Sequence, residues 1–171
     1  GAPQAILQHG HWTHPSGAMR WELWPGDFLV RLAGAPAPDL IFYDPFSFKT
    51  DAALWTPETF AKLRAACGAK PAELYTYSAA TAVRAALLSA GFFVGEGIGT
   101  GPKADTTIAC SHAGGARAHP LAPRLLGAEW LARWRRSSAH APASLTAEAR
   151  PAFERSIEDH PQFSARPAAA P

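Results

Sequence analysis

The stretch Asp39-Leu40-Ile41-Phe42-Tyr43, followed directly by Asp44, decides the fold of this sequence. Four consecutive apolar or aromatic residues stand between two aspartates, shortly after Pro38. A short unbroken run of this kind is typical of a strand that is buried on both faces, as the strands of a parallel sheet are. We therefore predict a strand at 39–43 whose carboxyl end carries Asp44.

A helix is predicted after this strand. Thr56-Pro57-Glu58 indicates its start, because a capping hydroxyl, a proline at the first helical position and an acid in the first turn all favour one. Phe60, Leu63 and Cys67 would then share one apolar face. Gly68 is expected to end the helix.

A second helix is expected from its capping residue Ser78 to Gly91. Strands are predicted at 20–24, 39–43, 73–77, 92–98 and 105–110. Because strands and helices alternate, we expect an α/β fold with parallel strands, the first three of them adjacent. The last two strands are joined by a glycine-rich connection alone, so they should form an antiparallel hairpin at one edge. The sequence thus predicts a Rossmann-like sheet.

Composition indicates one globular domain with a sizeable core, since the 171 residues are 47% hydrophobic and 18% charged. The formal net charge of +2 neither requires nor excludes a nucleic-acid partner. No apolar run approaches the length of about 20 residues that a membrane helix needs, and the first residues lack the features of a signal peptide. Cys67 and Cys110 lie in apolar surroundings and are expected to be buried free thiols, which favours a cytoplasmic location over a disulfide-forming one.

The composition changes after His112, so we predict a domain at 1–112 and a second region at 113–171. The second region combines a linker, a basic amphipathic helix at 125–136 and an Ala- and Pro-rich tail. The helix could bind RNA through its arginines and tryptophans, by charge and stacking. We favour the alternative that the tryptophans cover the sheet while the arginines face water. These residues are Trp130, Trp134, Arg133, Arg135 and Arg136.

The histidines near the start of the chain suggest a metal site at first sight. His9, His11 and His14 are close together, but their spacing fits no common zinc pattern and no cysteine pair accompanies them. We predict no metal.

Three stretches carry a resemblance to a known family. The first runs from Asp44 to Lys49 and continues at 54–56, the second covers Thr76-Tyr77-Ser78-Ala79 with 83–84, 87 and 90–92, and the third joins Gly97-Ile98-Gly99 to Lys103 and Ala109. Together they resemble the MnmC-like tRNA wobble-uridine methyltransferases, which are class I enzymes dependent on S-adenosylmethionine. The likeness covers about residues 20–112. The sequence departs from the family pattern at Phe48, Thr50 and Asp51, so the loop after Asp44 could hold its substrate differently.

The resemblance implies a function and a set of site residues. The family transfers a methyl group from S-adenosylmethionine to an aminomethyl nitrogen on the wobble uridine of tRNA. Asp44 would be the catalytic residue, and Asp27 with Phe28 would contact the adenine of the cofactor. The substrate-binding residues implied are Pro45, Phe46, Lys49, Tyr77 and Ser78.

Each of these residues has a plainer interpretation. Asp27 could instead cap the next helix, and Asp44 could be a strand-end carboxylate bonded to loop amides. Phe46 could stack on a base or pack in the core. Lys49 could meet a phosphate or merely face water. Ser78 would serve as a helix cap in either case.

The family's first strand, its glycine-rich loop and the acid that binds the ribose are not found before Arg20. We therefore expect a partial methyltransferase domain whose binding of S-adenosylmethionine is weak. The open sheet edge should favour self-association, or be covered by the chain's own ends. Two alternatives remain: a non-catalytic remnant that binds RNA or a partner protein, and a methyltransferase for another substrate.

Overall fold

The computed structural model describes residues 1–46, 50–99, 105–114 and 124–164. The chain forms two compact units, Gly1–Ala35 and Pro36–Pro171.

The first unit is built around a small antiparallel hairpin. Its elements are α1 (Ala2–His9), β1 (His11–Thr13), β2 (Arg20–Glu22) and α2 (Phe28–Leu32). Trp21 pairs with Trp12 across the hairpin, and the connecting loop turns at Gly17, whose φ is +73°. The prediction that the strand at 20–24 lies in the parallel sheet is therefore wrong. A partner strand was available a few residues upstream, and closing so short a loop costs less entropy than a distant pairing.

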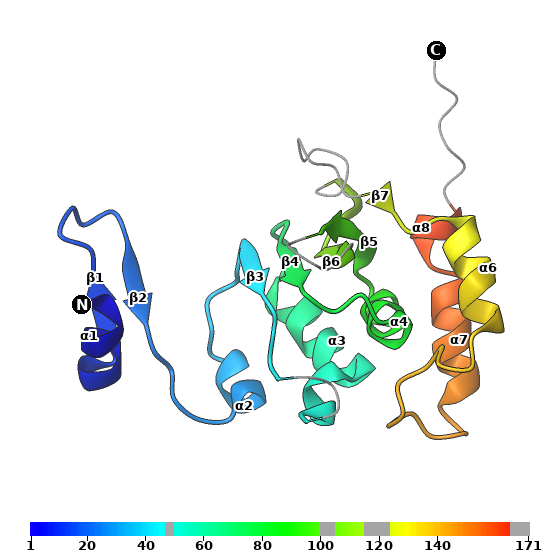
Figure 1. Ribbon diagram of the computed structural model, residues 1–171, viewed down its shortest axis with the longest axis horizontal. Coiled ribbons are helices and arrows are strands. Elements are labelled where there is room, and N and C mark those ends of the chain that lie inside the picture. Colours follow the sequence, from blue (N-terminus) through cyan, green and yellow to red (C-terminus); the bar gives the residue numbers. More distant parts are fainter. Residues whose placement is uncertain (47–49, 100–104, 115–123, 165–171) are drawn as a thin grey trace, which may run out of the picture. The chain divides into compact units, whose positions relative to one another are not determined.

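The second unit contains a five-stranded mixed sheet in the order β3-β4-β6-β5-β7 (Figure 1). β3 and β4 are parallel, and the other neighbours are antiparallel. The predicted α/β class and the antiparallel hairpin of β5 and β6 are confirmed, but the hairpin is not at the edge of the sheet, because β7 pairs with β5 beyond it. The strands are β3 (Leu40–Phe42), β4 (Glu73–Thr76), β5 (Phe93–Ile98), β6 (Asp105–Cys110) and β7 (Arg124–Leu125).

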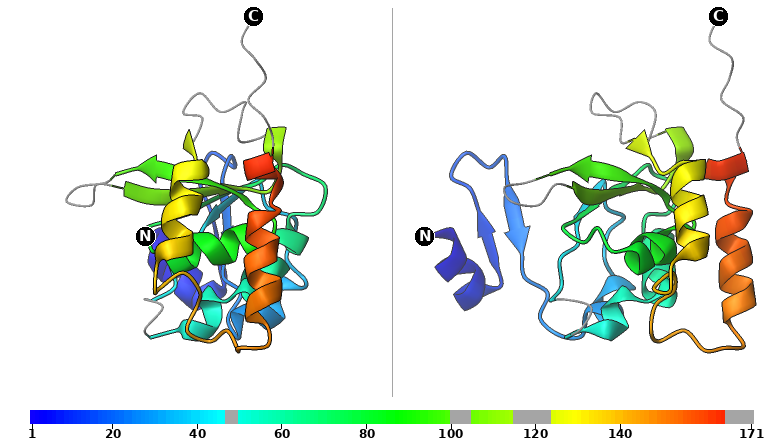
Figure 2. Two further views of the ribbon diagram at one scale, coloured as in Figure 1. Left: turned by 90° about the vertical axis from the view of Figure 1, so that its right-hand side faces the viewer. Right: turned by 45° about the vertical axis from the view of Figure 1, so that its right-hand side comes forward.

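Helix α4 is the centre of the core, because α3, β5 and α7 all pack on it (Figure 2). Leu87, Leu88 and Phe92 at this centre are almost fully buried, as is Ile157 of α7. The helical elements of this unit are η1 (Ala52–Trp55), α3 (Pro57–Ala66), α4 (Thr81–Ser89), α6 (Ala128–Arg136), α7 (Arg150–Glu158) and α8 (Pro161–Ser164).

The predicted signals of α3 are confirmed in detail. The Thr56 hydroxyl accepts a hydrogen bond from the Thr59 N–H at 3.2 Å, and Pro57 occupies the first helical position. Gly68 follows the helix with a φ of +59°, a conformation that favours glycine.

Strand β3 lies at one edge of the sheet and is buried on one face alone. Tyr43, which continues the ladder to Tyr75, is buried, whereas Leu40 and Phe42 are 49% and 78% exposed. Alternate side chains of a strand point to opposite faces, so Leu40 and Phe42 share the open one. The prediction of burial on both faces is therefore wrong within this unit, since none of its described residues covers that face.

A glutamine side chain covers part of the opposite edge. The Gln162 Oε1 accepts from the Val94 N–H at 2.7 Å, and its Nε2 donates to the Val94 and Leu126 carbonyls, at 2.8 Å each. The amide of Gln162 thus pairs with β5 much as a residue of a neighbouring strand would.

The tryptophans of α6 lie inside the molecule. Trp130 and Trp134 are 6% and 2% exposed, with ring centroids 6.4 Å apart in a stacked arrangement, and Trp130 also stacks on Phe163. Stacking of these two indoles on RNA bases is therefore ruled out. The alternative is correct in that both indoles are buried and the arginines of α6 are exposed, and the ring contacts of the indoles are with each other, Phe163 and His140. The predicted linker lies mostly at 115–123, outside the described residues.

The two cysteines are buried free thiols, as predicted. Burial raises the pKa of Cys110 to about 11, so this thiol stays protonated at neutral pH. No helix in the described part of the chain is long and apolar enough to cross a membrane.

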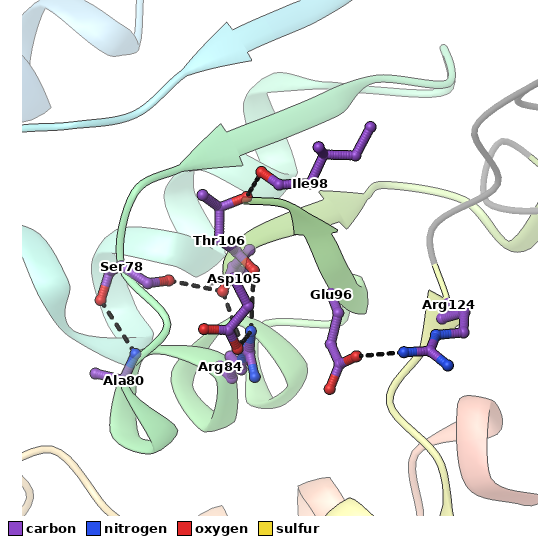
Figure 3. A network of polar contacts seen from close by, with 9 residues as sticks. Ser78, Ala80, Arg84, Glu96, Ile98, Asp105, Thr106 and Arg124 are labelled. Carbon is purple, nitrogen blue, oxygen red and sulfur yellow. Dashed lines mark hydrogen bonds and ion pairs between the residues drawn. The ribbon is translucent and has the colours of Figure 1, made fainter. Parts of the chain in front are cut away.

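The side chain of Arg84 in α4 is buried, and its guanidinium lies among residues of β6 (Figure 3). Its Nε donates to the Thr107 hydroxyl at 2.9 Å, and its Nη2 donates to Asp105 at 3.0 Å and to the Thr106 carbonyl at 2.9 Å. The Thr107 hydroxyl donates in turn to the Ser78 carbonyl at 2.6 Å. Arg84 therefore joins α4 to β6 and, through Thr107, to the loop after β4.

We expect Arg84→Lys to lower the free energy of unfolding by about 1–3 kcal/mol, because an ammonium cannot reproduce the guanidinium's planar set of donors. Arg124→Lys is the matched control, since Arg124 pairs with Glu96 at 3.3 Å while 89% exposed. Its effect should stay within about 0.5 kcal/mol. Urea unfolding of both variants measures the difference, and equal losses would contradict a special role for Arg84.

We expect the free energy of unfolding to depend on pH because of His160. Its ring is buried against Phe93 and Phe163, and burial lowers its pKa below the ordinary value of 6.5. Between these two pKa values the unfolded chain binds more protons than the folded one. Stability contributed by the neutral ring is therefore complete above pH 6.5 and is lost as the pH falls through the folded pKa. Urea unfolding at several pH values should show a shallower acid loss in His160→Asn, but an unchanged one in His9→Asn, which alters an exposed histidine.

Candidate functional site

Asp44 lies just beyond the carboxyl end of β3 and is held by the neighbouring strand. Its Oδ1 accepts from the Thr76 hydroxyl at 3.0 Å and from the Tyr77 N–H at 2.8 Å. Its second oxygen forms no hydrogen bond with any described residue, and the side chain is exposed. One carboxylate oxygen is therefore anchored, and the other can accept a hydrogen bond from a substrate.

An aromatic cluster holds the start of the loop after Asp44 in place. Tyr43, Trp55 and Phe60 meet edge to face, with ring centroids 5.5 to 6.3 Å apart. The Tyr43 hydroxyl donates to the Leu54 carbonyl, and the Trp55 Nε1–H donates to the Phe46 carbonyl at 2.9 Å. Burial raises the pKa of Tyr43, which keeps this hydroxyl a donor. The start of the loop thus has a defined backbone position.

The structure describes two of the three predicted substrate-binding residues in this loop. The ring of Phe46 is 79% exposed, so it does not pack in the core. Pro45, directly after Asp44, is half-buried. Lys49 lies outside the described residues. The structure thus brings Asp44, Pro45 and Phe46 together at the end of β3.

Tyr77 and Ser78 lie in the loop after β4, beside Asp44. Tyr77 offers its backbone N–H to Asp44, and its side chain is 54% exposed. Ser78 is not the cap of α4: the helix starts at Thr81 after Ala80, and no side chain caps it. The prediction of a Ser78 cap fails because the Ser78 backbone is held further back, by Thr76 on one side and Thr107 on the other.

Thr76, Thr107 and Arg84 complete the site and were not predicted as site residues. The buried Thr76 hydroxyl donates to Asp44 and accepts from the Ser78 N–H at 3.2 Å. A line of hydrogen bonds therefore runs from Asp44 through Thr76, Ser78 and Thr107 to Arg84. Thr76 belongs to the Thr-x-Ser-Ala stretch of the family resemblance, which was a usable signal. Nothing in the sequence indicates the pairing of Thr107 with Arg84.

Asp27 and Phe28 belong to the first unit. The Asp27 Oδ1 accepts from the Val30 N–H at 3.0 Å and caps α2, so the capping interpretation of Asp27 is correct. Phe28 opens this helix and is 39% exposed. Contact of the pair with adenine stays a prediction.

No group of three or more metal-binding side chains lies together among the described residues. His11 hydrogen-bonds the His9 carbonyl, and His14 hydrogen-bonds Ser16.

Comparison with known proteins places this chain in a family. Residues 3–112 match the S-adenosyl-L-methionine-dependent methyltransferases. The chain belongs to this family, whose cofactor is S-adenosylmethionine. No curated protein sequence matches it significantly.

A solved structure supports the same fold. The crystal structure of MnmC2 from Aquifex aeolicus is similar with a TM-score of 0.62 and 21% sequence identity. The likeness covers 91% of this chain but 48% of the MnmC2 chain, so the present chain spans about half of that protein's length. At this identity the likeness shows the fold.

Proposed function

We propose that this chain carries the methyl-acceptor side of a methyltransferase that modifies an aminomethyl nitrogen on the wobble uridine of tRNA. The observation that carries the proposal is Asp44, a carboxylate anchored through one oxygen at the end of a sheet strand. Ligands of open α/β sheets bind at these carboxyl ends. The resemblance of the stretches at 44–49 and 76–79 to the MnmC-like family adds support for the tRNA substrate.

The proposed chemistry needs an amine with a free lone pair. S-adenosylmethionine would supply the methyl group from its sulfonium centre. The amine nitrogen forms the new bond to the methyl carbon while the carbon–sulfur bond breaks, and the nitrogen then loses a proton. The free oxygen of Asp44 accepts an N–H of the amine, which orients the lone pair, and can take that proton.

The surrounding residues have supporting roles in this proposal. Thr76 and the Tyr77 N–H keep the carboxylate of Asp44 from rotating. The exposed ring of Phe46 offers a surface on which a base can stack, beside Pro45. The loop of Tyr77 and Ser78 borders the same place, and Lys49 would contact a phosphate.

Binding of the cofactor by this chain is proposed to be weak. Asp27 and Phe28 would contact the adenine alone, and the Asp27 carboxylate already caps α2. Isothermal titration calorimetry should give a dissociation constant for S-adenosylmethionine weaker than about 1 μM. Submicromolar binding would show that the described residues hold more of the cofactor than this proposal assigns to them.

The catalytic role of Asp44 is tested by Asp44→Asn in the enzyme that carries this chain. Asparagine keeps the volume and an oxygen for Thr76 and Tyr77, so the fold should be retained. The single-turnover rate of methyl transfer to tRNA with an aminomethyl wobble uridine should fall by about 10²- to 10⁴-fold. Thr76→Val should have a smaller effect, and Thr50→Ala in the same loop should cost least.

A single-turnover rate near that of the unaltered enzyme for Asp44→Asn would refute the catalytic role. Asp44 would then be a structural strand-end residue, as in its plainer interpretation. Binding of tRNA without methyl transfer in the unaltered enzyme would instead favour the non-catalytic alternative. Transfer to another acceptor alone would favour a different substrate.

A further inference from the structure

Two cavities lie against the first turn of α4, on the side where the C-terminal region passes. One has a volume of about 300 Å³ and the other of about 310 Å³. Both are at the lower end of the range for small-molecule sites, so each has room for one ring or one small polar group. One wall of each is formed by residues beyond 112. Asp44, Phe46, Tyr77 and Ser78 line neither cavity, and only the supporting residues Trp55 and Arg84 are shared with the site around Asp44.

The first cavity is apolar and is lined mainly by alanines. Its walls are the first turn of α4 at 80–83, the segment 139–144, and Ala52 with Trp55 of η1. The small alanine side chains leave the space open, and the buried indole of Trp55 forms one side of it. Trp55 also donates to the Phe46 carbonyl, so this wall is tied to the loop that follows Asp44. Such a cavity suits a planar ring with little polarity on its faces.

The second cavity has polar and aromatic residues in its lining, two of them arginines. It is lined by Thr81 and Arg84 of α4 and by Trp130, Arg133, Trp134 and Ser137 around α6. Asp105 balances the charge of Arg84, whereas Arg133 is exposed and forms no ion pair with any described residue. The hydroxyls of Thr81 and Ser137 lie on the same walls. An anion fits this cavity, because Arg133 supplies an uncompensated positive charge and several donors surround it.

The two cavities are close to each other on the side of α4 and on the side of the C-terminal region. Thr81 lines both, and on the opposite wall Ser137 of the second cavity is followed closely by Ala139 of the apolar one. A planar ring would therefore lie beside an anion. A planar base joined to a phosphate through a sugar is the ligand class that offers a ring and an anion to two neighbouring cavities of this kind, and a nucleotide has this composition.

We propose that these cavities bind one nucleotide of the RNA substrate, with its base in the apolar cavity and its phosphate at Arg133. This inference rests on the proposed function, since it takes the acceptor to be RNA. Arg84 acts here as a positioning residue as well, because its contacts through Thr107 hold the Ser78 loop near Asp44. The nucleotide would thus be held on the α4 side of the loop that borders the acceptor amine.

Arg133→Gln tests the phosphate contact, and Arg136→Gln is its matched control on the same helix, since Arg136 is exposed but does not line the cavity. Binding of uridine 5′-monophosphate is followed through the NMR signal of the indole N–H of Trp134, a residue that lines the cavity. Arg133→Gln should weaken this binding about tenfold, as expected for one lost charge-assisted contact. For an unmodified tRNA transcript the slope of log affinity against log salt should become shallower by about 0.7–0.9. Arg136→Gln should change the mononucleotide affinity little.

Ala143→Phe tests the apolar cavity, because the added ring fills it from the rim. Ala147→Phe is the control, since Ala147 is exposed and lies outside both cavities. Ala143→Phe should weaken binding of uridine and of its monophosphate alike, and Ala147→Phe should leave both unchanged. Midpoints of thermal unfolding equal to that of the unaltered chain would show that the fold of both variants is intact.

Several results would overturn the inference. Equal losses in Arg133→Gln and Arg136→Gln would mean diffuse attraction to a basic helix. Inorganic phosphate binding as tightly as the mononucleotide would mean a simple anion site. If Arg133→Gln and Ala143→Phe both kept normal methyl transfer and tRNA affinity, the cavities would not be part of the RNA site. The proposed function would not be affected by that result. If the cavities bound the nucleotide as expected but no methyl transfer to tRNA took place, the proposed function would be refuted. The cavities would still be a nucleotide-binding site.

Discussion

The Thr107 hydroxyl connects a buried charge to the loop on which the site is built. It accepts from the Arg84 guanidinium and donates to the Ser78 carbonyl, at 2.9 and 2.6 Å. A guanidinium inside a protein is tolerated where its donors find acceptors, so α4 and β6 cannot shift independently. The Ser78 N–H is held by Thr76, which also holds Asp44. The position of the carboxylate at the end of β3 therefore depends on a charge that lies on α4.

The parts of this fold that could be predicted are those with local causes. Thr56 and Pro57 start α3 and Gly68 follows it, because a capping hydroxyl, a fixed φ and a left-handed turn act within a few residues. The hairpin of β5 and β6 likewise depends on a short connection. Asp44 was identified because it ends an apolar strand.

The wrong predictions share a different cause, which is competition from elsewhere in the chain. The segment at 20–24 has the pattern of a strand, but its pattern does not say which strand it pairs with, and β1 was nearest. Arg84 looks like a surface residue of a helix, yet the acceptors that allow its burial come from β6, more than 20 residues later. Ser78 has the residue type of a cap, but Thr76 and Thr107 already hold its backbone. Pairing and burial of this kind are set by tertiary contacts that a local pattern does not contain.

The two edges of the five-stranded sheet have different capacities for extension. At β5 the amide of Gln162 occupies both the N–H and the carbonyl of Val94, and β7 pairs with the next two residues. At β3 no strand formed by the described residues pairs on the outer side. β7 is only two residues long, and the side chain of Gln162 takes the position beside Val94 that a longer β7 would occupy. A side chain thus completes one side of β5 where the backbone pairing of β7 stops, whereas a strand added beside β3 would meet backbone groups that no strand of the described residues has taken.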